Sequence, residues 1–274
     1  YYEPEISFTA LLPARKEESV IYETIRIVDE IDYPEHLKEI LILIRDEDDD
    51  DTIAESHRAI ADIKKSYEDK GEEWPNNVHL ITFTDGPKNK PNGLNRGYKA
   101  STKDVLCIFD AEDAPHAQIY NTINTVMLRD DADVVQAGVQ LMNFDYNWFS
   151  AFNVLEYFFW FKSGLHAFTH GTNVTPLGGN TVFFGKDWLD KLAAQDLEKG
   201  YRAWDEGTLT EDADVGFRLT TLGASIQIVY EAELATQEET PHNVEQFIKQ
   251  RTRWCQGFYE IFRKADWLTL PTMK

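Results

Sequence analysis

The sequence has little cysteine, little positive charge and no long apolar run, and each shortage excludes a class of protein. Its 274 residues contain two cysteines, Cys107 and Cys255, so no disulfide framework is expected and a reducing compartment is the default. No stretch reaches the roughly 18 uninterrupted apolar residues that a transmembrane helix needs. The chain starts at Tyr1 and has no signal peptide, which predicts a piece excised from a longer protein.

Basic residues are outnumbered, because 27 Lys and Arg stand against 48 Asp and Glu and give a formal net charge of −21. This balance argues against nucleic acid or an anionic lipid surface as a partner, since both attract basic faces. An acidic surface favours solubility and disfavours self-association, and it is also compatible with a high-salt host. Hydrophobic residues still make up 42% of the chain, which is enough to build a packed core.

The first half of the chain alternates short apolar runs with segments of helical periodicity. This alternation predicts an α/β fold with a mostly parallel sheet and helices on both faces. In such sheets ligands bind beyond the carboxyl ends of the strands, and Asp46 and Asp110 follow two of them. Strands are predicted at residues 6–12, 39–44, 78–83, 105–109 and 134–137, and helices at 17–31, 52–67, 93–100 and 118–128.

The second half opens with an aromatic segment, residues 147–168, which Glu156 and Lys162 interrupt with charge. Two interpretations stay open for it: a buried helix, or an amphipathic helix that lies on a membrane surface or against segments outside this chain. Further strands are predicted at residues 181–184 and 225–230, and helices from 186, at 212–222 and at 243–262.

Three carboxylates crowd the four residues Asp110-Ala111-Glu112-Asp113 at the end of a predicted strand. They repel one another, and a hard divalent cation such as Mg²⁺ or Mn²⁺ would relieve the repulsion and keep coordination positions for phosphate. The alternative is a solvated loop with helix-capping acids. A second acidic run, residues 46–51, also has two interpretations: caps for the next helix, or a hydrogen bond to a nucleotide base or ribose.

Two predicted helix starts also carry candidate chemistry. Lys90 precedes a helix, and a lysine beside a helix N-terminus suits a phosphate. Thr210 precedes another helix, where a threonine is a common N-cap. The carboxylate of Asp212, two residues later, is a candidate general base.

One face of the last predicted helix collects Gln250, Arg253 and Trp254, which are spaced at i, i+3 and i+4. An amide, a guanidinium and an indole on one face suit a pyrophosphate and a sugar ring. The alternative is a surface arginine packed on a tryptophan.

In order along the chain, these motifs resemble those of the family 2 glycosyltransferases, in particular the processive, membrane-embedded branch with the cellulose, chitin and hyaluronan synthases. The resemblance runs from about Ser7 to Phe262. Its most specific part is Thr210-Glu211-Asp212 followed by Gln250-Arg251-Thr252-Arg253-Trp254, after an acidic motif. It implies a GT-A fold in which residues 1–274 form a single catalytic domain, with a nucleotide-sugar half at about 5–140 and an acceptor half at about 141–274.

The resemblance further implies inverting transfer from a nucleotide diphosphate sugar, with UDP favoured and GDP left open, to a growing glycan through a β-linkage. Asp212 would be the general base with Glu211 beside it, and Asp110 would hold Mg²⁺ or Mn²⁺ together with Glu112 or Asp113. The donor would be bound by Asp46 or Asp48 at the base, and by Lys90, Asn95, Gln250 and Arg253 near the diphosphate. The acceptor would meet Gly179, Asn180 and Trp254.

Two departures from the family pattern have consequences. The usual acidic motif has Asp at the place of Glu112, so the second metal ligand is either Glu112 or its neighbour Asp113. The transmembrane helices that flank the domain in this branch are absent from the sequence, which predicts that they were cut away; the alternative is a naturally soluble relative. The resemblance thus implies a domain that works at the cytoplasmic face of the cell membrane.

Two other functions compete with this one. A sugar nucleotidyltransferase would need a glycine-rich phosphate loop near the first strand, where Pro13-Ala14-Arg15-Lys16-Glu17 contains no glycine. A non-catalytic module that only binds nucleotide sugars would not need the acidic motif, Asp212 and Arg253 together.

Overall fold

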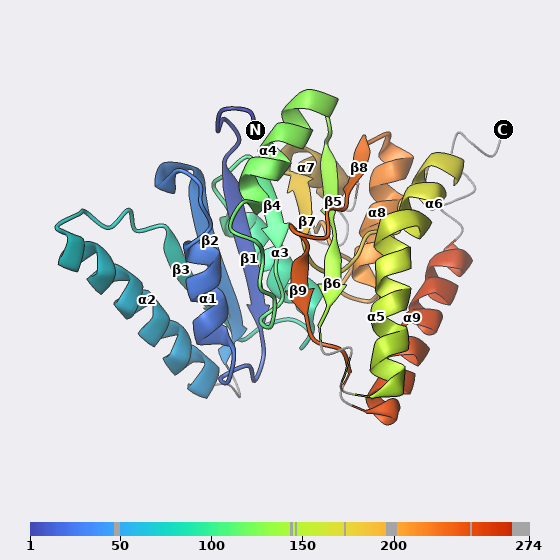
Figure 1. Cartoon of the computed structure of the whole chain (residues 1–274), viewed down its shortest axis with the longest axis horizontal. Helices are drawn as coiled ribbons and strands as arrows, with labels where there is room; N and C mark the ends of the chain where they lie inside the picture. The colour runs from blue at the N-terminus through green and yellow to red at the C-terminus, as the bar shows by residue number, and fades with distance from the viewer. Residues whose placement is uncertain are drawn as a thin grey trace.

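The computed structural model describes residues 1–46, 50–142, 145, 147–172, 174–195, 202–241 and 243–264. Its centre is a seven-stranded sheet with helices on both faces (Figure 1). The strands are β1 (Phe8–Ala14), β2 (Lys38–Arg45), β3 (Val78–Phe83), β4 (Val105–Ile108), β5 (Val134–Ala137), β7 (Val182–Gly185) and β8 (Ile226–Val229), and they stand in the order β3-β2-β1-β4-β7-β5-β8.

Neighbouring strands of this sheet are parallel except at β7, which runs antiparallel to β4 and β5. The predicted α/β fold with a mostly parallel sheet is therefore confirmed. β7 and β8 come from the predicted acceptor half of the chain, and they pair with strands of the predicted nucleotide-sugar half.

Helices close both faces of the sheet, because buried side chains point alternately to either side along each strand. In β2, Ile40, Ile42 and Ile44 pack into one core, while Leu41 and Leu43 pack into the other. The first core is covered by α1 (Ile21–Asp29), α2 (Asp50–Lys70) and α4 (Ile119–Asp130). The second is covered by α3 (Lys90–Ala100), α7 (Lys186–Ala194) and α8 (Glu211–Leu222).

Two of the differences between predicted and observed element ends have a clear physical reason. β1 continues through Pro13 to Ala14. Proline has no backbone N–H to donate, but β1 pairs with β4 only as far as Leu11, so Pro13 needs no hydrogen bond on that side of the strand. The helix predicted from residue 17 begins only at Ile21, since Lys16 adopts a φ of 59° and a turn closed by the Glu17 carbonyl follows it.

A second, two-stranded sheet joins β6 (Val139–Leu141) to β9 (Thr236–Glu238) in parallel. An isolated antiparallel bridge between Ala114 and Gln237 ties β9 to the acidic turn that follows β4. Neither strand was predicted, because three residues are too few to display a period of two.

The aromatic segment forms α5 (Trp148–Phe159), a π-helical stretch η3 (Trp160–Gly164) and α6 (Leu165–Thr172), rather than one regular helix. The last helix, α9 (Val244–Lys264), packs against α5 (Figure 1), where Arg251 donates hydrogen bonds to Asn153 and Glu156. Phe149 and Phe161 are buried. Other aromatic side chains of this segment are exposed: Trp148 (73%), Phe152 (68%) and Phe159 (61%).

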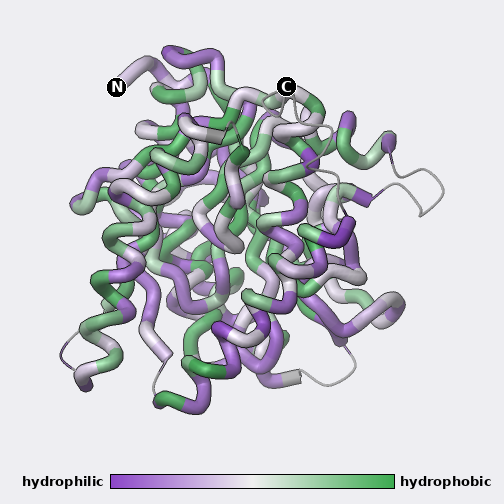
Figure 2. The backbone as a smooth tube through the Cα atoms, turned by 90° about the vertical axis from the view of Figure 1, so that its right-hand side faces the viewer, coloured by the Kyte–Doolittle hydropathy of each residue, from purple (hydrophilic) through white to green (hydrophobic). Residues whose placement is uncertain are grey.

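The buried-helix interpretation therefore describes one face of α5 only. Figure 2 looks onto this side of the molecule, where hydrophobic and hydrophilic residues alternate along the helices. No helix within the described ranges is both long enough and apolar enough to cross a membrane.

Gly216 allows α8 to approach residues 174–177. A Cβ added at Gly216 would stand 2.3 Å from the Thr175 carbonyl oxygen and 2.9 Å from the Leu177 backbone nitrogen. At Gly93 in α3, an added Cβ would find its nearest neighbour at 3.6 Å, which is ordinary contact.

We predict that Gly216→Ala lowers the free energy of unfolding by about 1–3 kcal/mol, because backbone atoms cannot move aside as a side chain can. The matched Gly93→Ala variant should be neutral or up to about 1 kcal/mol more stable, since alanine is the better helix former. Urea unfolding of both variants measures the difference. Equal stabilities would contradict the close approach of α8.

Candidate active site

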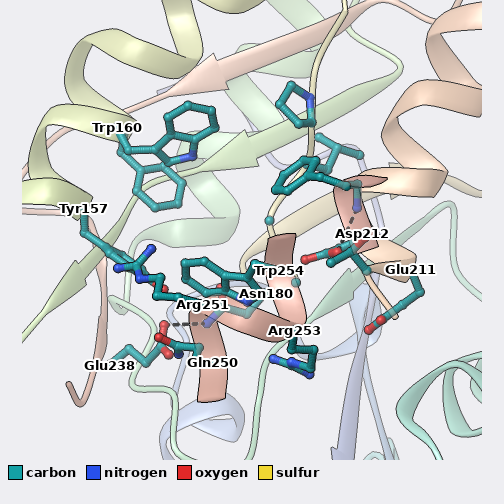
Figure 3. A pocket seen from close by; sticks show the side chains of 18 of the residues that line it. Tyr157, Trp160, Asn180, Glu211, Asp212, Glu238, Gln250, Arg251, Arg253 and Trp254 are labelled. Carbon is teal, nitrogen blue, oxygen red and sulfur yellow. Dashed lines mark hydrogen bonds between the residues drawn. The ribbon is translucent and has the colours of Figure 1, made fainter. Parts of the chain in front are cut away.

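A cavity of about 660 Å³ lies beyond the carboxyl end of β4, between the N-terminus of α8 and the helices α5, η3 and α9 (Figure 3). Residues from both halves of the sequence line it. The predicted site residues among them are Lys90, Asp110, Gly179, Asn180, Glu211, Asp212, Gln250, Arg253 and Trp254. The position agrees with the expectation that ligands bind beyond the strand ends of a parallel sheet.

Lys90 joins two walls of this cavity. It stands at the start of α3, whose N-cap Asn89 accepts a hydrogen bond from the Asn92 backbone at 3.2 Å. Its Nζ donates to Asp110 Oδ1 and, at 2.8 Å, to the Gly179 carbonyl. Burial alone would lower the pKa of Lys90, but the neighbouring carboxylates, Asp110 first, raise it. The ammonium therefore stays charged at the centre of the acidic site.

The acidic motif divides into one buried and two accessible carboxylates. Asp113 is 1% exposed, and its oxygens accept from the Asp110 backbone at 2.7 Å and from Asn180 Nδ2 at 2.9 Å. Burial raises the pKa of Asp113 well above its usual value, and Asp110 and Glu238 raise it further. Because both Asp113 oxygens already have partners, the geometry favours the exposed Glu112 as the companion of Asp110.

The residues present fit a divalent cation that is held partly by the protein and partly by the substrate. In the part of the chain that the structure describes, no three His, Cys, Asp or Glu side chains are placed to hold a metal on their own. A cation at Asp110 and Glu112 would therefore take further oxygen ligands from phosphates or water, which is the usual arrangement for Mg²⁺ at nucleotide sites.

Asp212 and Glu211 begin α8 and face Lys90. Asp212 Oδ1 accepts a hydrogen bond from the Ala213 backbone at 2.8 Å. Burial raises the pKa of Asp212, against the opposing effects of that hydrogen bond and of Lys90. Burial, and then the charge of Asp212, raises the pKa of Glu211 to about 7. Thr210 stands at the N-cap position as predicted, but its hydroxyl makes no capping hydrogen bond and has no hydrogen-bond partner among the described residues.

The face of α9 predicted from helical spacing is observed, since Gln250, Arg253 and Trp254 all line the cavity. Arg253 is exposed, and its charge lowers the pKa of Glu211 and of Asp212. The arginine that packs on the Trp254 ring, at 4.3 Å from its centroid, is Arg251 instead. The face therefore has both an arginine that lines the cavity, Arg253, and an arginine that packs on the tryptophan, Arg251.

Several cavity residues are not among the predicted site residues, and those with polar or aromatic side chains include Tyr157, Trp160, Glu238 and Arg251. Glu238 lies on β9, and its carboxylate accepts from Asn180 Nδ2 at 3.4 Å. Burial, and then Asp110 and Glu112, raises the pKa of Glu238 to about 7. The one available signal was the pair of glutamates in Thr236-Gln237-Glu238-Glu239, which has no distinctive spacing.

Two described residues predicted to bind the donor, Asn95 and Asp46, do not line the cavity. Asn95 is 3% exposed, and its amide exchanges hydrogen bonds with the Trp204 backbone at 2.9 and 3.1 Å. It therefore anchors the segment before α8. Asp46 is exposed at the end of β2, away from the cavity lining, and Asp48 lies outside the described residues.

A family model described as "Glycosyltransferase like family 2" matches residues 4–257. The chain belongs to this family. Curated relatives include the probable glycosyltransferase YdaM of Bacillus subtilis (25% identical over 93% of this chain and 55% of the relative) and a poly-beta-1,6-N-acetyl-D-glucosamine synthase of Staphylococcus epidermidis (26%, 98% and 58%). A beta-monoglucosyldiacylglycerol synthase of Trichormus variabilis is 24% identical over 92% of this chain and 49% of the relative. The chain spans about half the length of these family members.

Solved structures of two glycosyltransferases share the fold of this chain. The mannosyltransferase PcManGT of Pyrobaculum calidifontis, in complex with GDP-Man and Mn²⁺, gives a TM-score of 0.68 at 17% identity, over 96% of this chain and 65% of that one. TarS 1-349 of S. aureus, in complex with UDP-GlcNAc, gives 0.59 at 13% identity, over 88% and 61%. The predicted GT-A fold is thereby confirmed.

Gly257 sets the distance between α9 and the start of α8. A Cβ added there would stand 2.3 Å from Thr210 Oγ1 and 2.4 Å from Thr210 Cγ2. One turn earlier on α9, Arg253 and Trp254 face the cavity.

We predict that Gly257→Ala moves α9 away from Thr210 and lowers the affinity for nucleotide diphosphate about tenfold, because Arg253 and Gln250 shift with the helix. Calorimetric titration with UDP or GDP and Mn²⁺ measures the effect. Gly171→Ala is the matched control, since an added Cβ there would meet nothing within 4 Å. Unchanged affinity in Gly257→Ala would contradict the prediction, because it would show that the position of α9 against Thr210 does not affect nucleotide binding.

Proposed function

We propose that this chain is the catalytic domain of an inverting, metal-dependent glycosyltransferase that uses a nucleotide diphosphate sugar, with Asp212 as its general base. One observation carries the proposal: the candidate base and the candidate metal ligand lie on either side of Lys90. Asp212 Oδ2 and Lys90 Nζ are 3.2 and 3.6 Å from the point where a Cβ of Gly179 would stand, and Lys90 binds Asp110. A single bound substrate can therefore reach both groups, as a transfer reaction requires.

The donor would lie with its diphosphate between Asp110 and α9. Asp110 and Glu112 would hold Mg²⁺ or Mn²⁺, which offsets negative charge on the diphosphate when it is bound. Lys90 and Arg253 supply fixed positive charge to the leaving group. The buried Gln250 amide oxygen has no hydrogen-bond partner within the described residues, and it can accept from a hydroxyl of the ligand. The Mn²⁺ and GDP-Man bound by PcManGT support this assignment.

In the proposed reaction an acceptor hydroxyl attacks the anomeric carbon on the face opposite the diphosphate. Asp212 removes the hydroxyl proton as the new glycosidic bond forms and the bond to the diphosphate breaks. An α-linked donor then gives a β-linked product. Burial raises the pKa of Asp212 toward the operating range of a base, while Lys90 and the Ala213 N–H keep the carboxylate ionised.

For the substrates, we propose a UDP-sugar as donor and a growing polysaccharide or other glycan as acceptor. The resemblance to polysaccharide synthases supports both choices, and the UDP-GlcNAc bound by TarS supports the first. Gly179, Asn180 and Trp254 would meet the acceptor near Asp212. Asp46 is the proposed contact of the nucleotide base.

We also propose that the domain works at the cytoplasmic face of a membrane. Exposed apolar side chains along α5 and α9 support this placement, because soluble surfaces seldom carry so many. Besides those of α5, they include Ile248 (57%), Tyr259 (63%) and Phe262 (62%) on α9.

Replacing the base tests the mechanism. We predict that Asp212→Asn lowers the turnover number by roughly 10²–10⁴-fold, because no base then removes the proton of the acceptor hydroxyl. The affinity for the donor should change little. Release of nucleotide diphosphate and calorimetric donor binding measure the two effects. Asp187→Asn, an exposed carboxylate on α7, is the control. Equal losses of turnover and donor binding would assign Asp212 to the donor site instead.

Removing the proposed metal ligand tests the second half of the site. We predict that Asp110→Ala abolishes the increase in donor affinity that Mn²⁺ causes in the unmodified chain, since the first ligand of the cation is gone. Titrations of donor with Mn²⁺ and with EDTA measure that increase. Asp85→Ala removes an exposed carboxylate and should leave it intact. An unchanged response to Mn²⁺ in Asp110→Ala would exclude Asp110 as a ligand.

A further inference from the structure

Glu238 is a cavity carboxylate that the mechanism above does not use. It lines the same cavity as Asp110, Asn180 and Gln250. Figure 3 shows it beside Gln250 and Arg251, across the cavity from Glu211 and Asp212, with its hydrogen bond to Asn180 drawn as a dashed line. Glu238 therefore faces the space that a donor attached at Asp110 would fill.

The backbone fixes the position of Glu238. On one side β9 pairs with β6, with Leu141 opposite Glu238, and the Glu238 carbonyl accepts from the Met142 N–H at 2.8 Å. On the other side Gln237 and Ala114 exchange two backbone hydrogen bonds, at 3.1 and 3.2 Å. The residue is thus held against the acidic turn after β4 by its own strand, and its place does not depend on a mobile side chain.

The carboxylate of Glu238 has few hydrogen bonds for a group in a buried setting. Within the described residues its one hydrogen-bond donor is Asn180 Nδ2, at 3.4 Å, and that amide is closer to Asp113, at 2.9 Å. The other near charges are the carboxylates of Asp110 and Glu112, which cannot donate, and the ammonium of Lys90, whose hydrogen bonds go to Asp110 and to the Gly179 carbonyl. A carboxylate has about four acceptor positions, and leaving them empty away from water costs free energy. The site therefore suits a ligand rich in hydroxyl donors.

We infer that Glu238 is a sugar-binding residue whose carboxylate accepts hydrogen bonds from two adjacent hydroxyls of the transferred sugar. This inference rests on the proposed function. The transferred sugar is favoured over the acceptor because Glu238 adjoins Asp110, where the diphosphate of the donor would lie, while Asp212 stands on the opposite side. The two carboxylate oxygens match the spacing of a vicinal diol, and a few such polar groups fix the orientation of a ligand in its pocket.

A comparison of two ligands tests the assignment. UDP-glucose, UDP-N-acetylglucosamine and GDP-mannose are first titrated with Mn²⁺ into the unmodified protein by calorimetry. The tightest of them and its nucleotide diphosphate are then titrated into Glu238→Gln, which keeps the size of the side chain. We expect the affinity for the nucleotide sugar to fall roughly 10- to 100-fold, because hydrogen bonds to a charged group are lost. The affinity for the nucleotide diphosphate should stay within about twofold and reports that the fold and the cation site are intact.

Two controls sharpen the test. Glu239→Gln makes the same change of charge at the exposed neighbour and should alter neither affinity. Donor analogues that lack one hydroxyl should bind the unmodified protein more weakly at the positions that Glu238 contacts, and should lose nothing further in Glu238→Gln.

Each other outcome has a distinct meaning. If the unmodified protein binds none of the three donors, the proposed function fails and the inference fails with it. If donors bind the unmodified protein and Glu238→Gln lowers the affinity for neither ligand, only the inference about Glu238 fails. An equal loss of affinity for nucleotide sugar and nucleotide diphosphate would mean that Glu238 supports the cation site or the fold. That result would also overturn its assignment as a sugar-binding residue.

Discussion

One ammonium group holds the acidic cavity together. Lys90 donates to Asp110 and to the Gly179 carbonyl, and it thereby joins the turn after β4 to the loop before β7. Glu211 and Asp212 approach the same charge from α8. Without a positive group at this point, so many carboxylates could share the space only by taking up protons or by moving apart. The arrangement of the carboxylates in the site therefore depends on a single lysine at the start of α3.

The sheet was predictable because its strands are apolar runs bounded by polar residues. β3 and β5 match their predicted ranges, β4 ends one residue earlier than predicted, and β2 is one residue longer than predicted at each end. The short strands β6 and β9 were not predictable, because their pairing depends on distant partners such as Ala114 and not on a local pattern. Glu238 was overlooked for that reason, since nothing in its neighbourhood distinguishes it from a solvated acid.

Helical spacing predicted which residues of α9 share a face, but it could not assign their partners. Trp254 packs under Arg251, whose guanidinium also binds α5, and this leaves Arg253 available to the cavity. Asn95 shows the same limit, because its amide is taken by the backbone of Trp204 more than a hundred positions away. Local patterns identify chemically capable side chains, and only the tertiary fold decides which of them remain available for a ligand.

The cavity also has an order of assembly. Lys90 and Asp110 come from the first half of the chain, and every strand of the seven-stranded sheet precedes residue 230. The wall that carries Gln250, Arg253 and Trp254 belongs to α9, the last described helix. During synthesis on the ribosome, the sheet and its acidic turn emerge before this wall exists. A nascent chain can therefore build the floor of the site early, but it cannot enclose a nucleotide until α9 has folded against α5.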